Sequence, residues 1–343
     1  MNSDKDTKVL SVIVPAYNAE KFIRDNLDSF CIDKIIDDVE VIVVNDGSED
    51  STADITEEYV KKYPRMFRLF NKKNGGHGSG INYGIKYARG RYFKVIDADD
   101  WVGREAFINL VEYLKCTDVD MVYSGFYWAY DDGGDKSSFE IKTEFKFPFK
   151  DVIYNIIYKF DDIAEKVYIK MHNICFKTSI LVQNNIIIDE NSYYVDTEYI
   201  LYPIPYIDTI SFLEDMVYYY RIGRKGQSIS IEKMKKNEKN YDLVLNSLFG
   251  FYDNLCTYHG CSEAKKKYIA SVVARVIAGK YKIMLSMDDS KKNEIIKFEK
   301  NLKKNHPDIY RKNINLAVKA LRITKYSTYF LVRFLVRKIY ANQ

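Results

Sequence analysis

The sequence predicts an α/β fold in which helices flank a mostly parallel sheet, followed by a helical C-terminal region. Two observations support this fold class. Over the first hundred residues, short apolar runs rich in β-branched residues alternate with longer segments of helical periodicity. From about residue 234, apolar side chains recur at helical spacing almost to the end. We therefore expect two domains, residues 1–230 and residues 231–343.

The elements of the first domain follow in order from these patterns. Four strands are expected at the runs KVLSVIVP, VEVIVVN, FRLFN and RYFKVID. Three helices are expected between them, over residues 19–30, 48–63 and 79–90, the last of which is closed by Gly90. Farther along, DMVYSGFYWAYDDGG is typical of a strand with a turn, residues 151–182 show mainly helical patterns, and residues 206–220 contain short strands.

Polar residues follow each of the four strands, at positions 16–18, 45–47, 71 and 97–100. The carboxyl ends of parallel strands converge, so these clusters should share one site. Asp97, Asp99 and Asp100 stand close together, and two carboxylates 4 Å apart repel by roughly 4 kcal/mol at an effective dielectric near 20. A divalent cation would relieve this repulsion, and oxygen ligands favour Mg2+ or Mn2+. The alternative is a turn in which Asp99 or Asp100 caps the next helix.

Composition argues against several classes of protein. The 343-residue chain, 47% hydrophobic and 29% charged, should be globular, and its net charge of +4 does not favour a nucleic-acid partner. Its polar N-terminus is unlike a signal peptide, and no window of about 20 residues is apolar enough for a spanning helix. Five scattered cysteines predict reduced thiols in a cytoplasmic protein, without structural zinc.

Three segments occur in a specific order: SVIVPAYNAEKFI, VEVIVVNDGSEDST and NGGHGSGINYGIKYARGRYFKVIDADDW. Together they resemble the family-2 glycosyltransferases, which have a GT-A fold and use a nucleotide-sugar donor. The resemblance is strong over residues 9–102 and loose over residues 103–230. It implies a GT-A catalytic domain over residues 1–230 of the type that builds bacterial cell-surface polysaccharides.

The resemblance implies donor contacts at the ends of the first two strands. Pro15, Ala16 and Tyr17 would line the nucleotide, with the tyrosine ring against the base. Asp46 would accept a hydrogen bond from the uracil imide, which fits a UDP donor, although Asn45 stands where many relatives carry an aspartate. Taken alone, the residues leave open that Asp46 caps a helix.

The segment NGGHGSG, residues 74–80, matches neither GxGxxG nor GxxxxGK. Its backbone N–H groups and the helix N-terminus that follows can approach a phosphate or sugar. Many relatives carry a donor-binding arginine where Gly80 stands, and a histidine is expected to replace part of that contact. A flexible loop is the alternative. The donor-contacting residues expected here are Asn74, Gly75, Gly76 and His77.

The resemblance also assigns the carboxylates of DADD. Asp97, with Ala98 beside it, matches the first acidic residue of the motif, near the ribose and the metal. Asp99 matches the direct ligand of Mn2+ or Mg2+. Asp100 matches a residue that faces the donor sugar or holds the loop.

An inverting transfer needs a carboxylate that takes the proton of the acceptor hydroxyl. Within IIIDENSYYVDTEYILYPI, the resemblance assigns this role to Asp196, with Glu198 as the fallback. Val195 stands where relatives often have glutamate. Taken alone, Asp196 is an N-cap candidate. His172 is expected either to line the acceptor pocket or to be a hydrogen-bonded structural residue.

The segment YYYRIGRKGQSIS resembles the one that closes the family's catalytic domain. Arg221, Arg224 and Lys225 could reach the diphosphate or an anionic acceptor. Gln227 and Ser228 could bind sugar hydroxyls. A solvated basic loop is the alternative.

After Asp308 there is no acidic residue, whereas eight lysines and arginines alternate with apolar residues. This pattern predicts that residues 311–340 contact an anionic membrane surface. The alternative is packing on the protein itself or on another subunit, and a homodimer stays open.

These observations predict an inverting, metal-assisted hexosyl- or N-acetylhexosaminyltransferase. It would move a sugar from a UDP-sugar to a hydroxyl of a glycan acceptor, free or lipid-linked, in the cytoplasm or at the inner face of the plasma membrane. One alternative is a nucleotidyltransferase acting on a sugar phosphate, which usually needs a basic glycine-rich loop that PAYNAEKF does not supply. The other is a non-catalytic sugar-nucleotide-binding protein, against which the intact carboxylates argue.

Overall fold

The structure is a computed structural model that describes residues 8–134, 136–144, 147–224, 227, 230–287 and 291–340. The chain forms two compact units, Met1–Gly223 and Arg224–Gln343. The sequence-based boundary after residue 230 stays a prediction.

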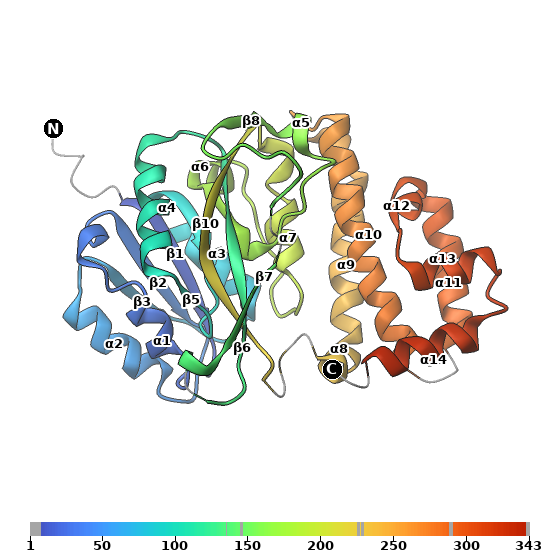
Figure 1. Ribbon diagram of the computed structural model, residues 1–343, viewed down its shortest axis with the longest axis horizontal. Coiled ribbons are helices and arrows are strands. Elements are labelled where there is room, and N and C mark those ends of the chain that lie inside the picture. The colour runs from blue at the N-terminus through green and yellow to red at the C-terminus, as the bar shows by residue number, and fades with distance from the viewer. Residues whose placement is uncertain are drawn as a thin grey trace. The chain divides into compact units, whose positions relative to one another are not determined.

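The N-terminal unit is built on a ten-stranded sheet (Figure 1). Its strand order is β3-β2-β1-β4-β9-β6-β10-β5, with β7 paired to β6 and β8 paired to β10. The strands are β1 Lys8–Ala16, β2 Val39–Asn45, β3 Phe67–Asn71, β4 Gly90–Val95, β5 Trp101–Val102, β6 Met121–Tyr130, β7 Glu140–Thr143, β8 Ile157–Lys159, β9 Ile174–Lys177 and β10 Thr209–Ile222.

Strands β1 to β4 form the parallel part of the sheet, which confirms the four strands expected from the apolar runs. Every residue of β2 is buried, as expected for a strand covered on both faces. The register pairs Ala16 with Asn45, and Asn45 with Asn71. The three strand ends therefore lie level with one another, and this places the polar residues that follow them at one edge.

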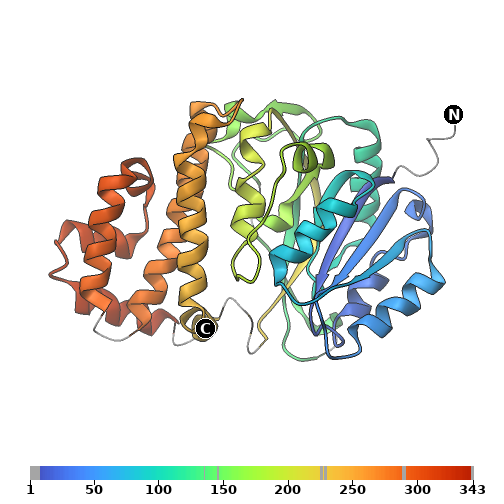
Figure 2. The ribbon, with the colours of Figure 1, turned by 180° about the vertical axis from the view of Figure 1, so that it is seen from behind.

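Helices cover both faces of this sheet (Figures 1 and 2). Helices α1 Ile23–Asp28, α2 Thr52–Lys62 and α4 Arg104–Cys116 lie on one face, and α3 His77–Tyr87 and α6 Thr178–Gln183 lie on the other. The predicted helix end at Gly90 is wrong, because α3 ends at Tyr87 and Gly90 begins β4. At Gly90 a Cβ atom would lie 2.3 Å from the Ser11 amide nitrogen, so the close approach of β1 requires glycine there.

Beyond β4 the sheet becomes mixed. Strand β9 runs antiparallel between β4 and β6, while β6 and β10 are parallel. The helical prediction for residues 151–182 is wrong at β8 and β9, strands of three and four residues that are too short to show a clear period. The short strands expected over residues 206–220 form the single 14-residue β10, whose register shifts between Phe212 and Tyr218.

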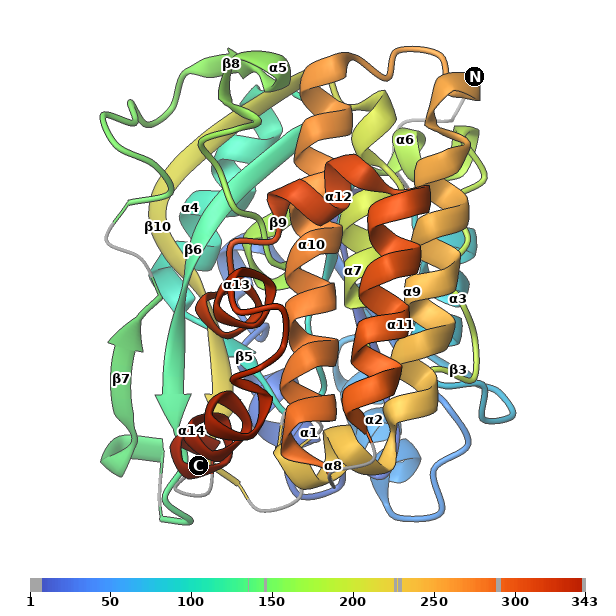
Figure 3. The same cartoon turned by 90° about the vertical axis from the view of Figure 1, so that its right-hand side faces the viewer.

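The C-terminal unit is helical in its described part, as predicted (Figure 3). Helix α10 lies at its centre and contacts α8, α9, α11, α12 and α14. In the described part of the chain, no helix combines the length and apolarity needed to cross a membrane. The helices are α8 Ile231–Lys236, α9 Glu238–Asp253, α10 Glu263–Ser286, α11 Lys291–Asn305, α12 Pro307–Lys312, α13 Leu316–Ile323 and α14 Tyr329–Tyr340.

Candidate active site

A pocket of about 360 Å3 opens at the carboxyl ends of β1 and β2. One wall consists of residues that the sequence assigned to the donor: Pro15, Ala16, Tyr17, Asp46, Asn74, Gly76 and His77. The other wall is formed by Asn191, Ser192 and Tyr193, from the loop before helix α7 Asp196–Leu201. The structure thus brings together segments that lie more than 170 residues apart, although their roles toward a donor stay predictions.

Asp46 shapes the glycine-rich loop. Its Oδ1 accepts hydrogen bonds from Lys72 Nζ at 2.5 Å and the Gly75 amide at 2.9 Å, and its Oδ2 accepts one from the Gly76 amide at 2.7 Å. Ser79 Oγ lies 3.3 Å from Oδ1. The side chain is buried, and these contacts replace the helix cap considered from sequence. Oδ2 retains a lone pair that can accept a further N–H group.

Two glycines let the loop before α7 approach the start of α3. Gly76 has a φ of +81° and lies against the backbone of Asn191, whose amide donates to the Gly75 carbonyl at 2.5 Å. A Cβ at Gly78 would lie 2.1 Å from the Asp189 carbonyl oxygen. The two loops therefore interlock through backbone atoms, and a side chain at position 78 would separate them.

Asn82 holds the same loop from the side of α3. Its amide nitrogen donates to the Ile188 carbonyl, and its amide oxygen accepts from the Ile188 N–H, both at 2.8 Å. One asparagine thus replaces a short piece of strand pairing. Next to it, a Cβ at Gly80 would lie 2.8 Å from Pro15 Cβ, so α3 packs too closely on β1 for the arginine that many relatives carry.

His77 connects the pocket to two carboxylates. Its Nε2 donates to Asp97 Oδ1 at 2.8 Å, and its Nδ1 lies 3.6 Å from Asp196 Oδ1. Burial favours the neutral imidazole, but Asp97 and Asp196 outweigh burial and raise the pKa of His77 to about 9. The ring is therefore cationic at neutral pH and fixed in place, unlike the flexible exposed histidine considered from sequence.

Buried hydrogen bonds fix the DADD turn, residues 97–100. Asn26 Nδ2 donates to the carbonyl oxygens of Asp97 and Asp100 at 3.0 and 2.8 Å. The buried Asp100 carboxylate accepts hydrogen bonds from the Tyr218 hydroxyl and, at 2.8 Å, from the Arg221 amide. Burial and the nearby charges of Asp99 and Asp97 raise the pKa of Asp100 well above its usual range. Helix α4 is capped at Gly103, so the helix-cap alternative for Asp99 and Asp100 is wrong.

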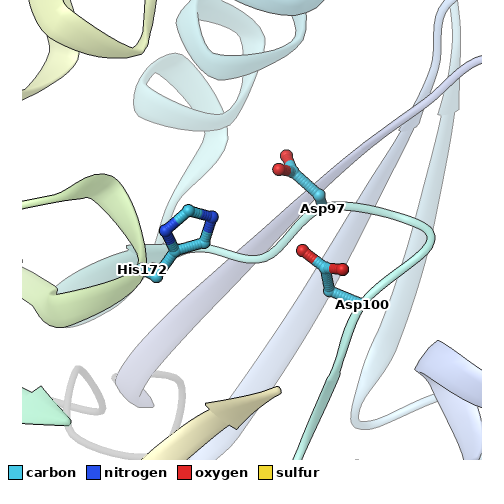
Figure 4. A group of neighbouring side chains, drawn as sticks. All are labelled: Asp97, Asp100 and His172. Carbon is cyan, nitrogen blue, oxygen red and sulfur yellow. The ribbon is translucent and has the colours of Figure 1, made fainter. Parts of the chain in front are cut away.

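Asp97, Asp100 and His172 form the one convergent set of metal-type ligands found among the described residues (Figure 4). Their ligand atoms lie within 4.8 Å of one another. Burial lowers the pKa of His172 to about 3, so the imidazole is neutral and keeps a lone pair. Two carboxylates and an imidazole suit Mn2+, with Asp97 the most available because both Asp100 oxygens already accept hydrogen bonds. Asp99 is outside this set, and its role as a ligand stays a prediction.

Asp196 is the first residue of α7, which spans Asp196–Leu201. Its carboxylate lies next to His77, which lines the pocket. The N-cap residue is Val195, so Asp196 does not cap this helix. Its side chain is 54% exposed, yet surrounding protein partly desolvates the carboxylate and raises its pKa, against the opposing charge of His77. Accessibility and proximity both suit the base predicted from sequence.

Glu198, the fallback base, is fully buried. Its Oε2 accepts the Asp189 amide hydrogen at 2.8 Å, while its Oε1 is enclosed without a hydrogen-bond partner. Burial raises the pKa of Glu198 to about 8. The residue holds the loop before α7 in place, and it is not accessible to an acceptor hydroxyl in this structure.

Arg221, predicted to reach the diphosphate, is not among the residues that line the pocket. The Arg221 guanidinium pairs with Asp25 at 2.8 Å and Asp131 at 3.3 Å and is almost fully buried, so it is not part of a solvated loop. Gln227 belongs to the C-terminal unit, where its Oε1 accepts the Arg224 amide hydrogen at 3.2 Å. Lys225 and Ser228 lie outside the described residues.

Sequence reasoning missed several residues that build the site. The cation that neutralises Asp46 is Lys72, and the need of a buried carboxylate for such a partner was the available signal. Nothing local pointed to Asn191, Ser192 and Tyr193 as a pocket wall, because their position depends on contacts with a distant loop.

Residues 11–183 match the family described as glycosyl transferase family 2. The uncharacterized glycosyltransferase EpsJ of Bacillus subtilis is 41% identical over 119 residues, which are 35% of this chain and 34% of EpsJ. The poly(ribitol-phosphate) beta-glucosyltransferase of Bacillus spizizenii is 29% identical over 228 residues, which are 65% of this chain and 33% of that enzyme. The matches thus span about a third of the length of these two relatives.

Two solved structures share the fold. S. aureus TarS 1–349, in complex with UDP-GlcNAc, superposes with a TM-score of 0.66 at 19% identity and covers 97% of this chain and 92% of TarS 1–349. The mannosyltransferase PcManGT of Pyrobaculum calidifontis, in complex with GDP-Man and Mn2+, gives a TM-score of 0.50 at 15% identity and covers 96% and 87% of the two chains. The expected GT-A fold is confirmed.

Proposed function

Because the chain belongs to glycosyltransferase family 2, we propose that it is an inverting enzyme that transfers a sugar from a UDP-sugar to a glycan hydroxyl. The observation that carries this proposal is the position of His77. This residue lines the donor-sized pocket and also contacts Asp97 and Asp196. A donor in the pocket would therefore have its reacting end beside the carboxylates.

Asp196 is the proposed general base. Its carboxylate takes the proton from the acceptor hydroxyl as that oxygen forms a bond to the anomeric carbon of the donor. The bond from the anomeric carbon to the diphosphate breaks in the same step, and the electron pair leaves with UDP. His77 lies between Asp97 and Asp196, so the base and the donor end would be close to each other.

The proposed donor is a UDP-hexose or UDP-N-acetylhexosamine. The free lone pair of Asp46 Oδ2 supports reading of a base N–H group, and the exposed ring of Tyr17 offers a face for stacking. Among proteins that share the fold, TarS has been solved with UDP and with UDP-GlcNAc, whereas PcManGT has been solved with GDP-Man. The nucleotide base is therefore the first specificity to measure.

A divalent cation fits the carboxylate end of this site. Asp97 would hold it, together with His172 on the observed geometry and Asp99 on the family resemblance. When bound, Mn2+ or Mg2+ would supply positive charge that stabilises the departing diphosphate. Burial and, after it, repulsion from Asp99 and Asp97 raise the pKa of Asp100, and a bound cation would relieve this repulsion.

Calorimetric titration with UDP, GDP and dTDP, each with and without Mn2+, tests the proposal. We expect Mn2+-dependent UDP binding that Asp99→Ala weakens and that Asp54→Ala, an exposed carboxylate on α2, leaves unchanged. Metal-independent binding, or binding without base preference, would contradict the donor and ligand assignments.

The released product separates the remaining alternatives. With a UDP-sugar and a glycan acceptor, a glycosyltransferase releases UDP, whereas a nucleotidyltransferase working on a sugar phosphate releases pyrophosphate. Metal-dependent UDP binding without turnover on any acceptor would favour a non-catalytic sugar-nucleotide-binding protein.

A further inference from the structure

We propose that the C-terminal unit attaches this protein to an anionic lipid surface through α14 and the segment from residue 314 that precedes it. This inference goes beyond the transfer reaction and does not depend on it. It rests on three observations: the charge of the unit, exposed apolar side chains, and cations without an acidic partner among the described residues.

The two units carry opposite charge. Residues 224–343 contain 26 lysines and arginines against 10 aspartates and glutamates, a formal charge of +16, whereas residues 1–223 carry −12. The small net charge of the whole chain hides this division. A strongly basic unit on a weakly charged protein indicates an anionic partner for that unit.

Large apolar side chains are exposed along the end of this unit. Between residues 314 and 339, eight of them are 49–82% exposed: Ile314, Leu316, Ile323, Phe330, Leu331, Phe334, Leu335 and Ile339. Isolated exposed apolar residues are normal on soluble proteins, but eight of them within 26 residues of sequence indicate an interaction surface.

The apolar residues of α14 are not those that pack the helix onto its unit. Tyr329, Val332 and Val336 are buried and face inward. The outward side presents two stripes with i, i+4 spacing, one formed by Phe330 and Phe334 and the other by Leu331, Leu335 and Ile339. The 12 residues of α14 extend about 18 Å, which suits a helix lying along a surface.

The basic residues of this region divide into two groups. Arg322 pairs with Glu299 at 2.8 Å, and Arg333 donates to the Met287 carbonyl, so both stabilise the unit itself. Four others have no acidic partner among the described residues: Lys319, Lys325, Arg337 and Lys338. Two of these, Arg337 and Lys338, lie in the last turn of α14. Lys292 Nζ lies 5.5 Å from the ring centroid of Phe330.

Exposed apolar side chains with cations close to them are the combination that binds the interface of an anionic bilayer. The Phe and Leu side chains can enter the acyl region while Lys and Arg remain with the headgroups. The same surface of a second copy is a poorer occupant, because a symmetric pairing would bring another unit of charge +16 against the first.

Co-sedimentation of the full-length protein with vesicles tests the inference. We expect binding to vesicles of phosphatidylglycerol and phosphatidylcholine in equal parts, much weaker binding to phosphatidylcholine alone, and a decrease as salt rises. The double variant Leu331→Ser/Phe334→Ser should lower the partition coefficient by at least about tenfold. Reversing the charges in the last turn of α14 with Arg337→Glu/Lys338→Glu should lower the partition coefficient on anionic vesicles in particular.

Helix α9 offers matched controls in the same unit. Leu243, 55% exposed, resembles Leu331 at 59%, and Lys239 is an exposed cation. Leu243→Ser and Lys239→Glu should sediment with vesicles like the wild type. Thermal melting and UDP binding of each variant show that the fold and donor site are intact, so failure here is distinct from failure of the proposed transferase.

Two outcomes would overturn the inference. Wild-type protein that stays in solution with anionic vesicles, or apolar variants that bind as well as the wild type, would remove the lipid assignment. A wild-type dimer in sedimentation velocity that Leu331→Ser/Phe334→Ser converts to monomer, without lipid binding, would assign the surface to a second copy.

Discussion

The two sides of the candidate active site hold their carboxylates in opposite ways. On the donor side, Asp46 is buried and accepts hydrogen bonds from Lys72, two backbone amides and Ser79. On the other side, Asp196 is 54% exposed, and His77 approaches it at 3.6 Å. An aspartate therefore fixes a loop at position 46 and remains able to accept a proton at position 196. Burial and the number of hydrogen-bond donors around each carboxylate decide which of the two roles it has.

Asp196→Asn tests the open side of this comparison and carries the largest expected effect. The amide keeps the shape of the carboxylate but cannot take a proton. We therefore expect kcat to fall about 10³-fold, while the affinity for UDP changes less than about threefold. Steady-state kinetics with a UDP-sugar and calorimetry with UDP measure the two quantities separately.

The matched control for this variant is Asp162→Asn. Asp162 is also exposed and lies in the first turn of a short helix, α5 Phe160–Ile163, away from the pocket residues. It should leave kcat unchanged. If Asp196→Asn retained full kcat as well, the base would have to be sought elsewhere in the site.

Asp46→Asn tests the fixed side. The substitution leaves Lys72 without its counter-ion. The amide group of asparagine would also point an N–H toward Lys72 or a backbone N–H, so the loop over residues 74–77 should lose its shape. We expect the free energy of unfolding to fall by about 3 kcal/mol, as for other broken buried pairs. UDP affinity should fall by about 100-fold, and calorimetry together with urea denaturation would detect both losses.

The exposed Asp54→Asn on α2 is the control, and it should change neither quantity. Normal stability combined with weak UDP binding in Asp46→Asn would mean that Asp46 contacts the nucleotide and contributes little to the loop. Asp46 and Asp196 would then differ in which ligand they contact, and no longer in whether the carboxylate stabilises a loop.

Gly78→Ala tests how the two sides are joined. Position 78 lies inside α3, where alanine is intrinsically favoured over glycine by about 1 kcal/mol. Its Cβ would nevertheless lie 2.1 Å from the Asp189 carbonyl oxygen, so the loop that carries Asn191 must move away. We expect a net destabilisation of about 1–3 kcal/mol and a roughly tenfold loss of UDP affinity, measured by thermal melting and calorimetry.

Gly250→Ala is the control for this variant. A Cβ there meets no atom within 4 Å, so the substitution in α9 should be neutral or slightly stabilising. A Gly78→Ala protein with unchanged UDP affinity would show that the Asn191–Tyr193 wall contributes nothing to the donor pocket.

The strand ends of the site could be predicted from the sequence, whereas the loop wall and the cluster at His172 could not. The strand ends around Pro15, Asp46 and Asp97 were predictable because each follows a buried parallel strand, and parallel strands end at one edge. The wall at 191–193 and the cluster at His172 depend on contacts across the fold, such as Asn82 with Ile188, 106 residues apart. No local period encodes such pairings, and β9 beside His172 was missed for the same reason.

Glu198→Gln carries the smallest expected effect. It adds to the comparison a third carboxylate, which is buried and holds the loop next to Asp196. The pKa of Glu198 rises from an ordinary 4.5 to about 8, so between these pH values the folded state binds a proton that the unfolded state has lost. Stability should therefore fall as pH rises through this window.

Glutamine mimics the protonated acid and still accepts from the Asp189 amide. We expect equal Tm values near pH 4.5 and a Tm several degrees higher for Glu198→Gln above pH 8. The exposed Glu57→Gln on α2 should show no such pH-dependent gap. A constant difference across the range would mean that Glu198 is ionised in the folded protein, and that burial alone does not decide how this site uses its carboxylates.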